Sequence, residues 1–336
     1  MNTQEYNTLI SGSLLIMATV CVTIALSYTS KFLIPFVLAL FLFYLITPLI
    51  SWLVNKLKFP KWLAIVSSFT VIGVVFSILI PFLGGSITTF IKGADVYLNR
   101  VINLLETIFV FFEKYKINFG QQLIVDTIKN MPIVNWASSL VGNAASLVTT
   151  SFLVLVFLFF MLVGTSVTTE RRGIWEKIGE KVERYLVTKV ITSLVTGILV
   201  GSILAFLGLE LAVVFGVLAF FLNFIPTVGS IIATLLPMPI AFLQFSNPLL
   251  ILFVFLLPFL VQLVIGNFIE PAIMGDHLDL HPVTILCALV FWGMIWGVSG
   301  MLMAAPMTAV LKIICDRFHI TQPVGEILAG RLPSGK

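Results

Sequence analysis

The sequence predicts an all-α polytopic membrane protein. Of its 336 residues, 59% are hydrophobic and only 10% are charged, whereas soluble domains carry about 25% charged residues. Apolar runs of about 18 residues or more can cross roughly 30 Å of hydrocarbon. Such runs lie near residues 9–26, 31–51, 62–83, 145–165, 190–207 and 249–269. Two longer apolar regions, 209–245 and 282–316, are interrupted by proline and glycine and predict broken or re-entrant helices.

The basic residues predict the orientation of these spans. A short loop at residues 56–61 and a linker at 170–189 hold nine of the nineteen lysines and arginines, and short basic loops stay in the cytoplasm. Both termini are then cytoplasmic and residues 84–144 lie outside, where their helical-period apolar residues predict amphipathic helices. The same bias accounts for the net charge of +4, so we expect no nucleic-acid partner.

The spans and loops predict five regions. They are three scaffold spans (1–83), extracytoplasmic helices (84–144), a fourth span with a cytoplasmic elbow helix (145–189), a transport core (190–316) and a cytoplasmic tail (317–336).

The transport core contains an internal repeat, 190–245 and 249–316. Each copy joins an unbroken span to a broken segment that opens Leu-acid-Leu, at Leu209 and at Leu278, and Pro237 falls at the same offset as Pro306. If each broken segment is a hairpin, the two copies are inverted across the membrane. Inverted repeats with broken helices are typical of secondary transporters.

The interruptions indicate a polar pathway, because irregular backbone at bilayer depth needs protein or water to satisfy it. We expect breaks at 223–229, at Glu270-Pro271, and at Gly293, Gly297 and Gly300. Close helix packing is the alternative use of such residues. The predicted pathway residues are Asn223, Pro226, Gly229, Gln262, Asn267, Gly297, Gly300 and Pro306.

Glu270 is the candidate residue for ion or proton coupling. It shares a helix face with Asn267, three residues earlier, and Gln262 extends that face. A solvated position at the end of a span is the alternative for this acid.

No catalytic or metal site is expected. His277 and His281 lack the further ligands of a tetrahedral site, and the three cysteines form no metal-type pairing. No catalytic constellation or nucleotide-binding motif is present, so we expect no enzyme and no cofactor.

The motifs of residues 205–315 resemble those of the autoinducer-2 exporter family. The C-terminal signature is read in Gly266-Asn267-Phe268-Ile269-Glu270-Pro271, Met274-Gly275, Leu280-His281-Pro282, Phe291-Trp292-Gly293, Trp296-Gly297, Gly300-Met301 and Pro306-Met307-Thr308, and a second one in residues 223–237. The resemblance implies a bacterial inner-membrane protein of about eight transmembrane elements, forming a homo-oligomer, a pentamer, that moves small polar solutes. Many members carry an acid where this chain has Ile265, whereas a branch with Ile-Glu-Pro carries it later, as Glu270 does.

We therefore predict a secondary transporter or exporter of a small polar metabolite such as autoinducer-2. The hairpin-containing core would move against the scaffold and expose a site between 223–229 and 297–300. The alternatives are a Na⁺(Li⁺)/H⁺ antiporter coupled through Glu270, as the resemblance implies for some members, and a passive channel or structural membrane protein. The expected partners are a small-molecule or ion substrate and the lipid bilayer.

Overall fold

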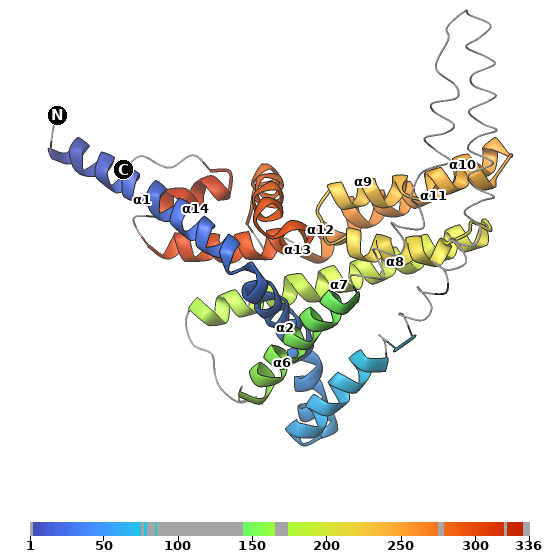
Figure 1. Ribbon diagram of the computed structural model, residues 1–336, viewed down its shortest axis with the longest axis horizontal. Coiled ribbons are helices and arrows are strands. Elements are labelled where there is room, and N and C mark those ends of the chain that lie inside the picture. Colours follow the sequence, from blue (N-terminus) through green and yellow to red (C-terminus); the bar gives the residue numbers. More distant parts are fainter. Residues whose placement is uncertain are drawn as a thin grey trace, which may run out of the picture. The chain divides into compact units, whose positions relative to one another are not determined.

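The computed structural model is all-helical over the residues it describes, which are 3–74, 77–78, 85, 144–164, 174–274, 279–318 and 321–331 (Figure 1). The chain forms two compact units. The terminal unit contains Met1–Trp62, Thr150–Val187 and Met274–Lys336, and the central unit contains Leu63–Thr149 and Thr188–Ile273. The predicted transport core thus contributes to both units. Nearly all of the predicted extracytoplasmic helices, 84–144, lie outside the described residues.

The terminal unit contains the first turns of α7. Its helices are α1 (Thr3–Tyr28), α2 (Ser30–Leu57), most of α6 (Ala144–Gly164), the start of α7 (Ile174–Phe206), α13 (Pro282–Arg317) and α14 (Gln322–Leu328). Ile178, Val182 and Tyr185 of α7 are buried against Ala305 of α13. This apolar stripe belongs to the predicted elbow helix, which continues without interruption into the predicted span 190–207.

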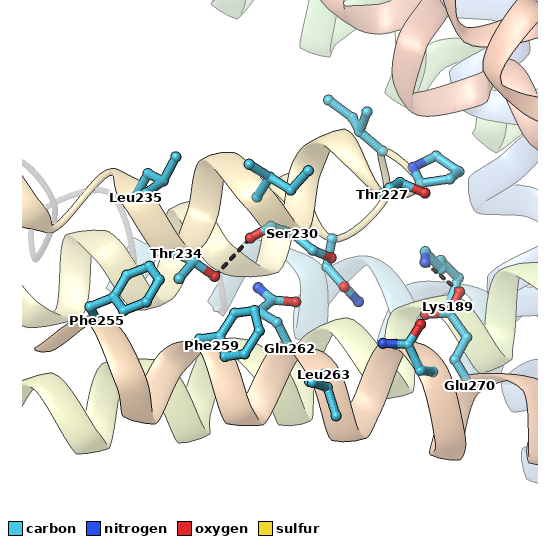
Figure 2. Close-up of a pocket in the computed structure, with 16 residues that line it drawn as sticks. Lys189, Thr227, Ser230, Thr234, Leu235, Phe255, Phe259, Gln262, Leu263 and Glu270 are labelled. Carbon is cyan, nitrogen blue, oxygen red and sulfur yellow. Dashed lines mark hydrogen bonds and ion pairs between the residues drawn. The ribbon is translucent and has the colours of Figure 1, made fainter. Parts of the chain in front are cut away.

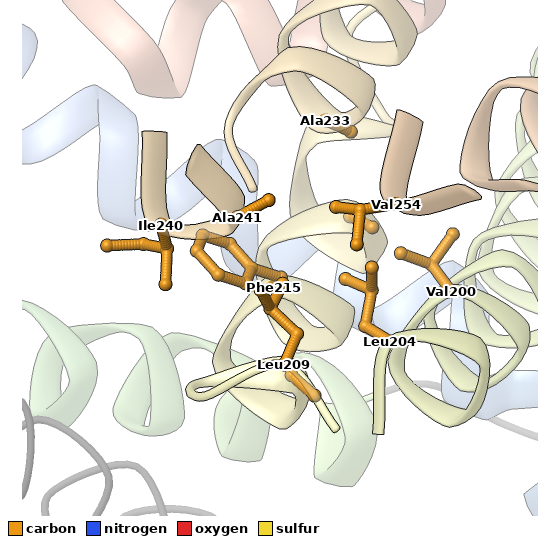
Figure 3. Packing of buried hydrophobic residues seen from close by; sticks show 10 residues of the cluster. Val200, Leu204, Leu209, Phe215, Ala233, Ile240, Ala241 and Val254 are labelled. Carbon is orange, nitrogen blue, oxygen red and sulfur yellow. The ribbon is translucent and has the colours of Figure 1, made fainter. Parts of the chain in front are cut away.

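The central unit packs short helices against the rest of α7. Its helices include α8 (Ala212–Leu222), α9 (Val228–Leu235), α10 (Met238–Gln244), α11 (Pro248–Val264), the π-helix η1 (Ile265–Ile269) and α12 (Glu270–Met274). Figure 3 shows the apolar core, in which Leu204 of α7, Phe215 of α8 and Val254 of α11 meet. Gly216 of α8 lies directly against Gly197 and Gly201 of α7, so the absence of side chains lets the two helices approach closely.

Among the described residues, four helices are long and apolar enough to cross a bilayer. They are Ser30–Leu57, Ile178–Phe206, Pro248–Ile273 and Pro282–Arg317. Shorter apolar helices cover Met17–Tyr28, Lys61–Val74, Thr149–Gly164, Ala212–Leu222 and Val228–Gln244. The prediction of a helical membrane protein is confirmed, while the total of eight elements and the inverted repeat stay predictions.

The first broken segment turns where the sequence predicted it. Helix α8 ends at Leu222 and α9 begins at Val228. Between them Thr227 adopts φ 60° and ψ −56°, a backbone conformation that L-residues rarely take. A Cβ atom at Gly229 would collide with the Leu222 carbonyl group. The turn therefore needs a glycine at this position.

The second broken segment turns at Gly297 inside α13, with φ 62° and ψ −142°. Gly300 faces the Trp292 carbonyl in the same way as Gly229 faces that of Leu222. The two arms are also joined by Trp292 Nε1, which donates a hydrogen bond of 3.1 Å to Thr308 Oγ1. Gly293 stays helical and lies against the Met301 side chain. Of the three glycines predicted to break this segment, Gly297 alone leaves the helical conformation.

The predicted break at Glu270-Pro271 is wrong, because the helix continues through it. Residues Ile265–Ile269 form a π-helix, and the Glu270 N–H donates to the Ile265 carbonyl five residues earlier. A proline ring displaces the carbonyl four residues before it, which here is that of Asn267. The wider π turn accommodates this displacement without ending the helix.

Candidate functional site

The central unit contains a cavity of about 510 Å³ (Figure 2). Its walls come from α7, the turn after α8, α9, α11, η1 and α12. This volume lies within the range of small-molecule sites, about 300–1,000 Å³. The lining residues are Lys189, Asn223, Ile225, Pro226, Thr227, Ser230, Ile231, Thr234, Leu235, Phe255, Phe259, Gln262, Leu263, Gly266, Asn267 and Glu270.

The cavity is polar at one end and apolar at the other. In Figure 2, Lys189 and Glu270 lie at one end, Leu235 and Phe255 lie at the opposite end, and Gln262 lies between them. An amphipathic lining of this kind fits a small molecule that combines hydrogen-bonding groups with an apolar face.

Lys189 and Glu270 form the charged end of the cavity. Lys189 Nζ donates a hydrogen bond of 2.5 Å to Glu270 Oε1, and their side chains are only 4% and 16% exposed. Both residues lie within candidate spans, Ile178–Phe206 and Pro248–Ile273. Each charge therefore supplies the partner that the other needs away from water.

The π-helix explains why Glu270 faces the same cavity as Gln262. In an uninterrupted α-helix, residues eight apart are rotated by about 80° from each other. The wider turn of η1 lies between the two residues and reduces this rotation. Gln262, Gly266, Asn267 and Glu270 accordingly all line the cavity.

Gln262 is a buried amide without a partner in the described structure. The residue is 5% exposed, and neither its Oε1 nor its Nε2 atom has a hydrogen-bond partner there. Leaving such a group unsatisfied costs about 1–3 kcal/mol. A ligand in the cavity that both donates and accepts hydrogen bonds would recover this free energy.

Asn223 holds the first turn against α7. Its Nδ2 donates a hydrogen bond of 3.0 Å to Ser193 Oγ, and both residues are buried. The Asn223 Nδ2 group is thus used to hold the turn against α7, and the turn places Pro226 and Thr227 at the cavity wall.

The structure brings together five of the nine predicted pathway and coupling residues. Asn223, Pro226, Gln262, Asn267 and Glu270 all line the cavity of the central unit. Gly229 shapes the adjoining turn without lining the cavity. Gly297, Gly300 and Pro306 belong to the terminal unit, where Pro306 is fully buried inside α13. A site between the two breaks stays a prediction.

Sequence reasoning missed Lys189, which it counted among the cytoplasmic basic residues of the elbow. A signal was present, because polar residues recur along one face of α7 at three- and four-residue spacing. These residues are Thr188, Lys189, Thr192, Ser193 and Thr196, and all are buried. Continuous burial of such a stripe indicates a polar interior rather than a solvated loop.

The terminal unit contains a second ionic cluster, at the ends of α13. Lys312 Nζ lies 2.8 Å from both Asp279 Oδ2 and Asp316 Oδ2, and Arg331 lies 3.0 Å from Asp279. The hydrogen bond from Lys312, assisted by the charge of Arg331, lowers the pKa of Asp279 against the opposing effect of burial. Among the described residues, no three His, Cys, Asp or Glu side chains gather as a metal site, and His277 lies outside those residues.

Comparison with known proteins gives one consistent result. A family model described as AI-2E family transporter matches residues 13–320. The chain is 28% identical to the AI-2 transport protein TqsA of Escherichia coli strain K12, over 92% of this chain and 93% of that protein. It is 29% identical to a putative transport protein of Borreliella burgdorferi, over 92% and 90% of the two chains.

The family match contains every residue that lines the cavity and both helical breaks. The apolar helices agree with a membrane location. We conclude that the chain belongs to the AI-2E family of transporters and is a multi-pass membrane protein.

Proposed function

We propose that this protein is a secondary transporter that exports a small polar metabolite, and that an autoinducer-2-like furanone is the first solute to test. The cavity of the central unit is the proposed solute site. The observation that carries this proposal is the buried Gln262 amide, which has no partner among the described residues and lines a cavity of about 510 Å³.

The amphipathic lining supports a small solute that is polar on one side. Gln262 and Asn267 offer hydrogen bonds, while Phe255 and Phe259 offer an apolar wall. The name of the Escherichia coli relative, an AI-2 transport protein, supports the furanone as the solute class.

We further propose that the two hairpins are the moving elements. Each one turns through a residue with positive φ, Thr227 or Gly297, and each presses a glycine against a carbonyl group of the preceding helix. This shared construction supports an internal repeat of inverted copies, in which the core 190–316 moves against the scaffold spans.

The test uses purified protein in sealed liposomes and measures autoinducer-2 flux. Gly266→Leu is the critical variant, because Gly266 lines the cavity and a Cβ atom there would meet nothing within 4 Å. The added side chain has open space, so it should leave the fold intact, and a bulky residue in the cavity wall should reduce flux at least tenfold. Gly73→Leu is the matched control, since a Cβ at Gly73 also meets nothing within 4 Å and the residue lies outside the cavity.

Three results would contradict the proposal. Absence of saturable autoinducer-2 flux in the parent protein would remove the furanone as the solute. Sodium-driven proton flux in the same liposomes would instead identify a cation/proton antiporter. Flux that never saturates would identify a passive channel.

We also propose an inner-membrane location and assembly as a homo-oligomer, a pentamer. These follow from the family resemblance and the loop charges. The mass of the detergent-solubilised protein, measured by light scattering with the detergent contribution subtracted, tests the assembly, and a monomer would contradict it.

A further inference from the structure

The Lys189–Glu270 pair lies where the chain enters and leaves the central unit. The segment Thr188–Ile273 belongs to that unit. Lys189 directly follows its first residue, and Glu270 precedes its last by three residues. Both side chains line the same end of the cavity (Figure 2). The pair therefore ties the entering helix α7 to the leaving helix α12 at one end of the candidate solute site.

Opening this pair in an empty cavity is costly. Among the described residues, neither charged group has a hydrogen bond or ion pair other than that between Lys189 Nζ and Glu270 Oε1, and no third charged side chain lines the cavity. Separation would leave two unpaired charges within membrane-spanning helices, where the penalty is far larger than for a surface pair. The empty protein should therefore keep the pair closed.

A polar solute changes this balance. Its hydroxyl groups can donate to the Glu270 carboxylate, and its oxygen atoms can accept from the Lys189 ammonium. Gln262 lies between the charged and apolar ends of the cavity (Figure 2) and can hold the solute beside the pair. Each charge then exchanges one partner for another instead of losing its partner.

We propose that Lys189 is a positioning residue for transport, whose ion pair with Glu270 opens when solute takes its place. The inference rests on the proposed function and adds to it a link between solute binding and the rate of conformational change. The loaded protein changes conformation faster than the empty one, so exchange of solute across the membrane outruns net release.

The test compares exchange and net efflux of labelled autoinducer-2 from liposomes. In the parent protein we expect exchange to be at least tenfold faster than net efflux, which corresponds to about 1.4 kcal/mol. Lys189→Met with Glu270→Gln removes both charges at similar side-chain size. In this double variant we expect the ratio to fall toward one.

The single variants and a second ion pair separate transport from folding. Lys189→Met or Glu270→Gln alone leaves one buried charge unpaired, so each should lower the melting temperature, and the double variant should recover it. Lys312→Met with Asp316→Asn is the matched control in the terminal unit, where Asp279 keeps its ion pair with Arg331. It should retain the parent ratio. A double variant that is stable and also keeps the parent ratio would show that the pair only stabilises the fold, and would overturn the proposal.

A second measurement does not depend on the solute. Ser230 lines the cavity, and Ser230→Cys can be labelled in a protein whose Cys21, Cys287 and Cys315 are replaced by serine. Without solute, a small charged thiol reagent should label this cysteine at least fivefold faster in the double variant than with the ion pair intact. Equal rates would overturn the inference even if autoinducer-2 is not transported, whereas absence of autoinducer-2 flux alone would contradict only the proposed function.

Discussion

Gly229 shows at the scale of one residue why the first hairpin turns where it does. Its hydrogen atom occupies space that a Cβ atom would have to share with the Leu222 carbonyl group. Backbone atoms of a packed helix have little freedom to move aside. The glycine therefore determines the closeness of α8 and α9, and through it the position of Pro226 and Thr227 at the cavity wall.

Gly229→Ala should destabilise the protein by about 2 kcal/mol or more, since the collision can be relieved only by moving backbone. Thermal unfolding in detergent, followed by circular dichroism, measures the loss. Gly73→Ala is the control, because its Cβ would meet nothing within 4 Å, and alanine favours a helix over glycine by about 1 kcal/mol. An unchanged melting temperature for Gly229→Ala would show that the turn is looser than described.

Gln262→Met should have opposite effects on stability and on function. Methionine removes an amide that is unsatisfied in the described structure, so the free energy of unfolding should rise by about 1–3 kcal/mol. Solute binding should weaken, because the unpaired donor and acceptor of Gln262 are gone. Thermal unfolding with and without autoinducer-2 measures both effects, and Leu263→Met, at a neighbouring lining position, is the control. A less stable Gln262→Met protein would mean that the amide has a partner in the empty cavity.

At the scale of elements, departures from ideal helix geometry occur at the candidate solute site and at the second hairpin turn. The π-helix η1 turns Glu270 toward the face of Gln262, and the positive φ of Gly297 divides α13 into two arms. Helix α7 is regular but carries the buried polar stripe that includes Lys189. The elements of the cavity are thus distinguished by the π turn and by buried polar groups, and the second hairpin by its glycine turn, rather than by hydrophobicity.

The C-terminal segment, which consists of α14 and the residues up to Arg331, links the two ends of α13. The His281 N–H donates to the Leu328 carbonyl at 3.0 Å, and Arg331 pairs with Asp279, which also pairs with Lys312. Helix α14 therefore docks against the start of α13 through the Leu328 carbonyl. Asp279, which precedes α13, links Arg331 after α14 to Lys312 near the end of α13.

This docking should weaken in acid. The hydrogen bond from Lys312 holds the pKa of Asp279 below its ordinary value of 3.8. The contribution of the ionised Asp279 carboxylate to this docking is therefore fully present above pH 3.8 and is lost as the pH falls through the lowered pKa. Limited proteolysis at a series of pH values from 7 to 3 should cleave the C-terminal segment readily only at the acidic end of the series.

Asp279→Asn should release the segment more readily at neutral pH and remove the acid dependence contributed by this group. Asp316→Asn is the control, because it leaves both the Asp279–Arg331 and the Asp279–Lys312 pairs in place. Release that is equal in both variants would contradict the role of Asp279.

At the scale of the whole molecule, the chain crosses between its two units several times. Its orientation in the membrane is predicted from the basic residues of its loops. We expect both termini in the cytoplasm. Cysteines introduced by Asn2→Cys and Gly335→Cys, each in a protein without other cysteines, should resist an impermeant maleimide in intact cells and react after permeabilisation. Labelling of either terminus in intact cells would contradict this orientation.

The sequence by itself determined the membrane class, the apolar helices, the two hairpin turns and four of the eight polar residues that line the cavity. Composition, run length, proline and glycine are local signals, so they can be recognised without a fold. Gln262, Asn267 and Glu270 were found because they lie close together along one stretch of chain.

Only the tertiary structure decided which partner Glu270 has. Lys189 lies 81 positions earlier, and the polar stripe around it does not reveal which helix it faces. The tertiary structure also decided that the chain at Pro271 continues through a π turn, which places Gln262 and Glu270 on the same cavity. Pairing of buried charges depends on which helices pack together, and that is a property of the whole fold.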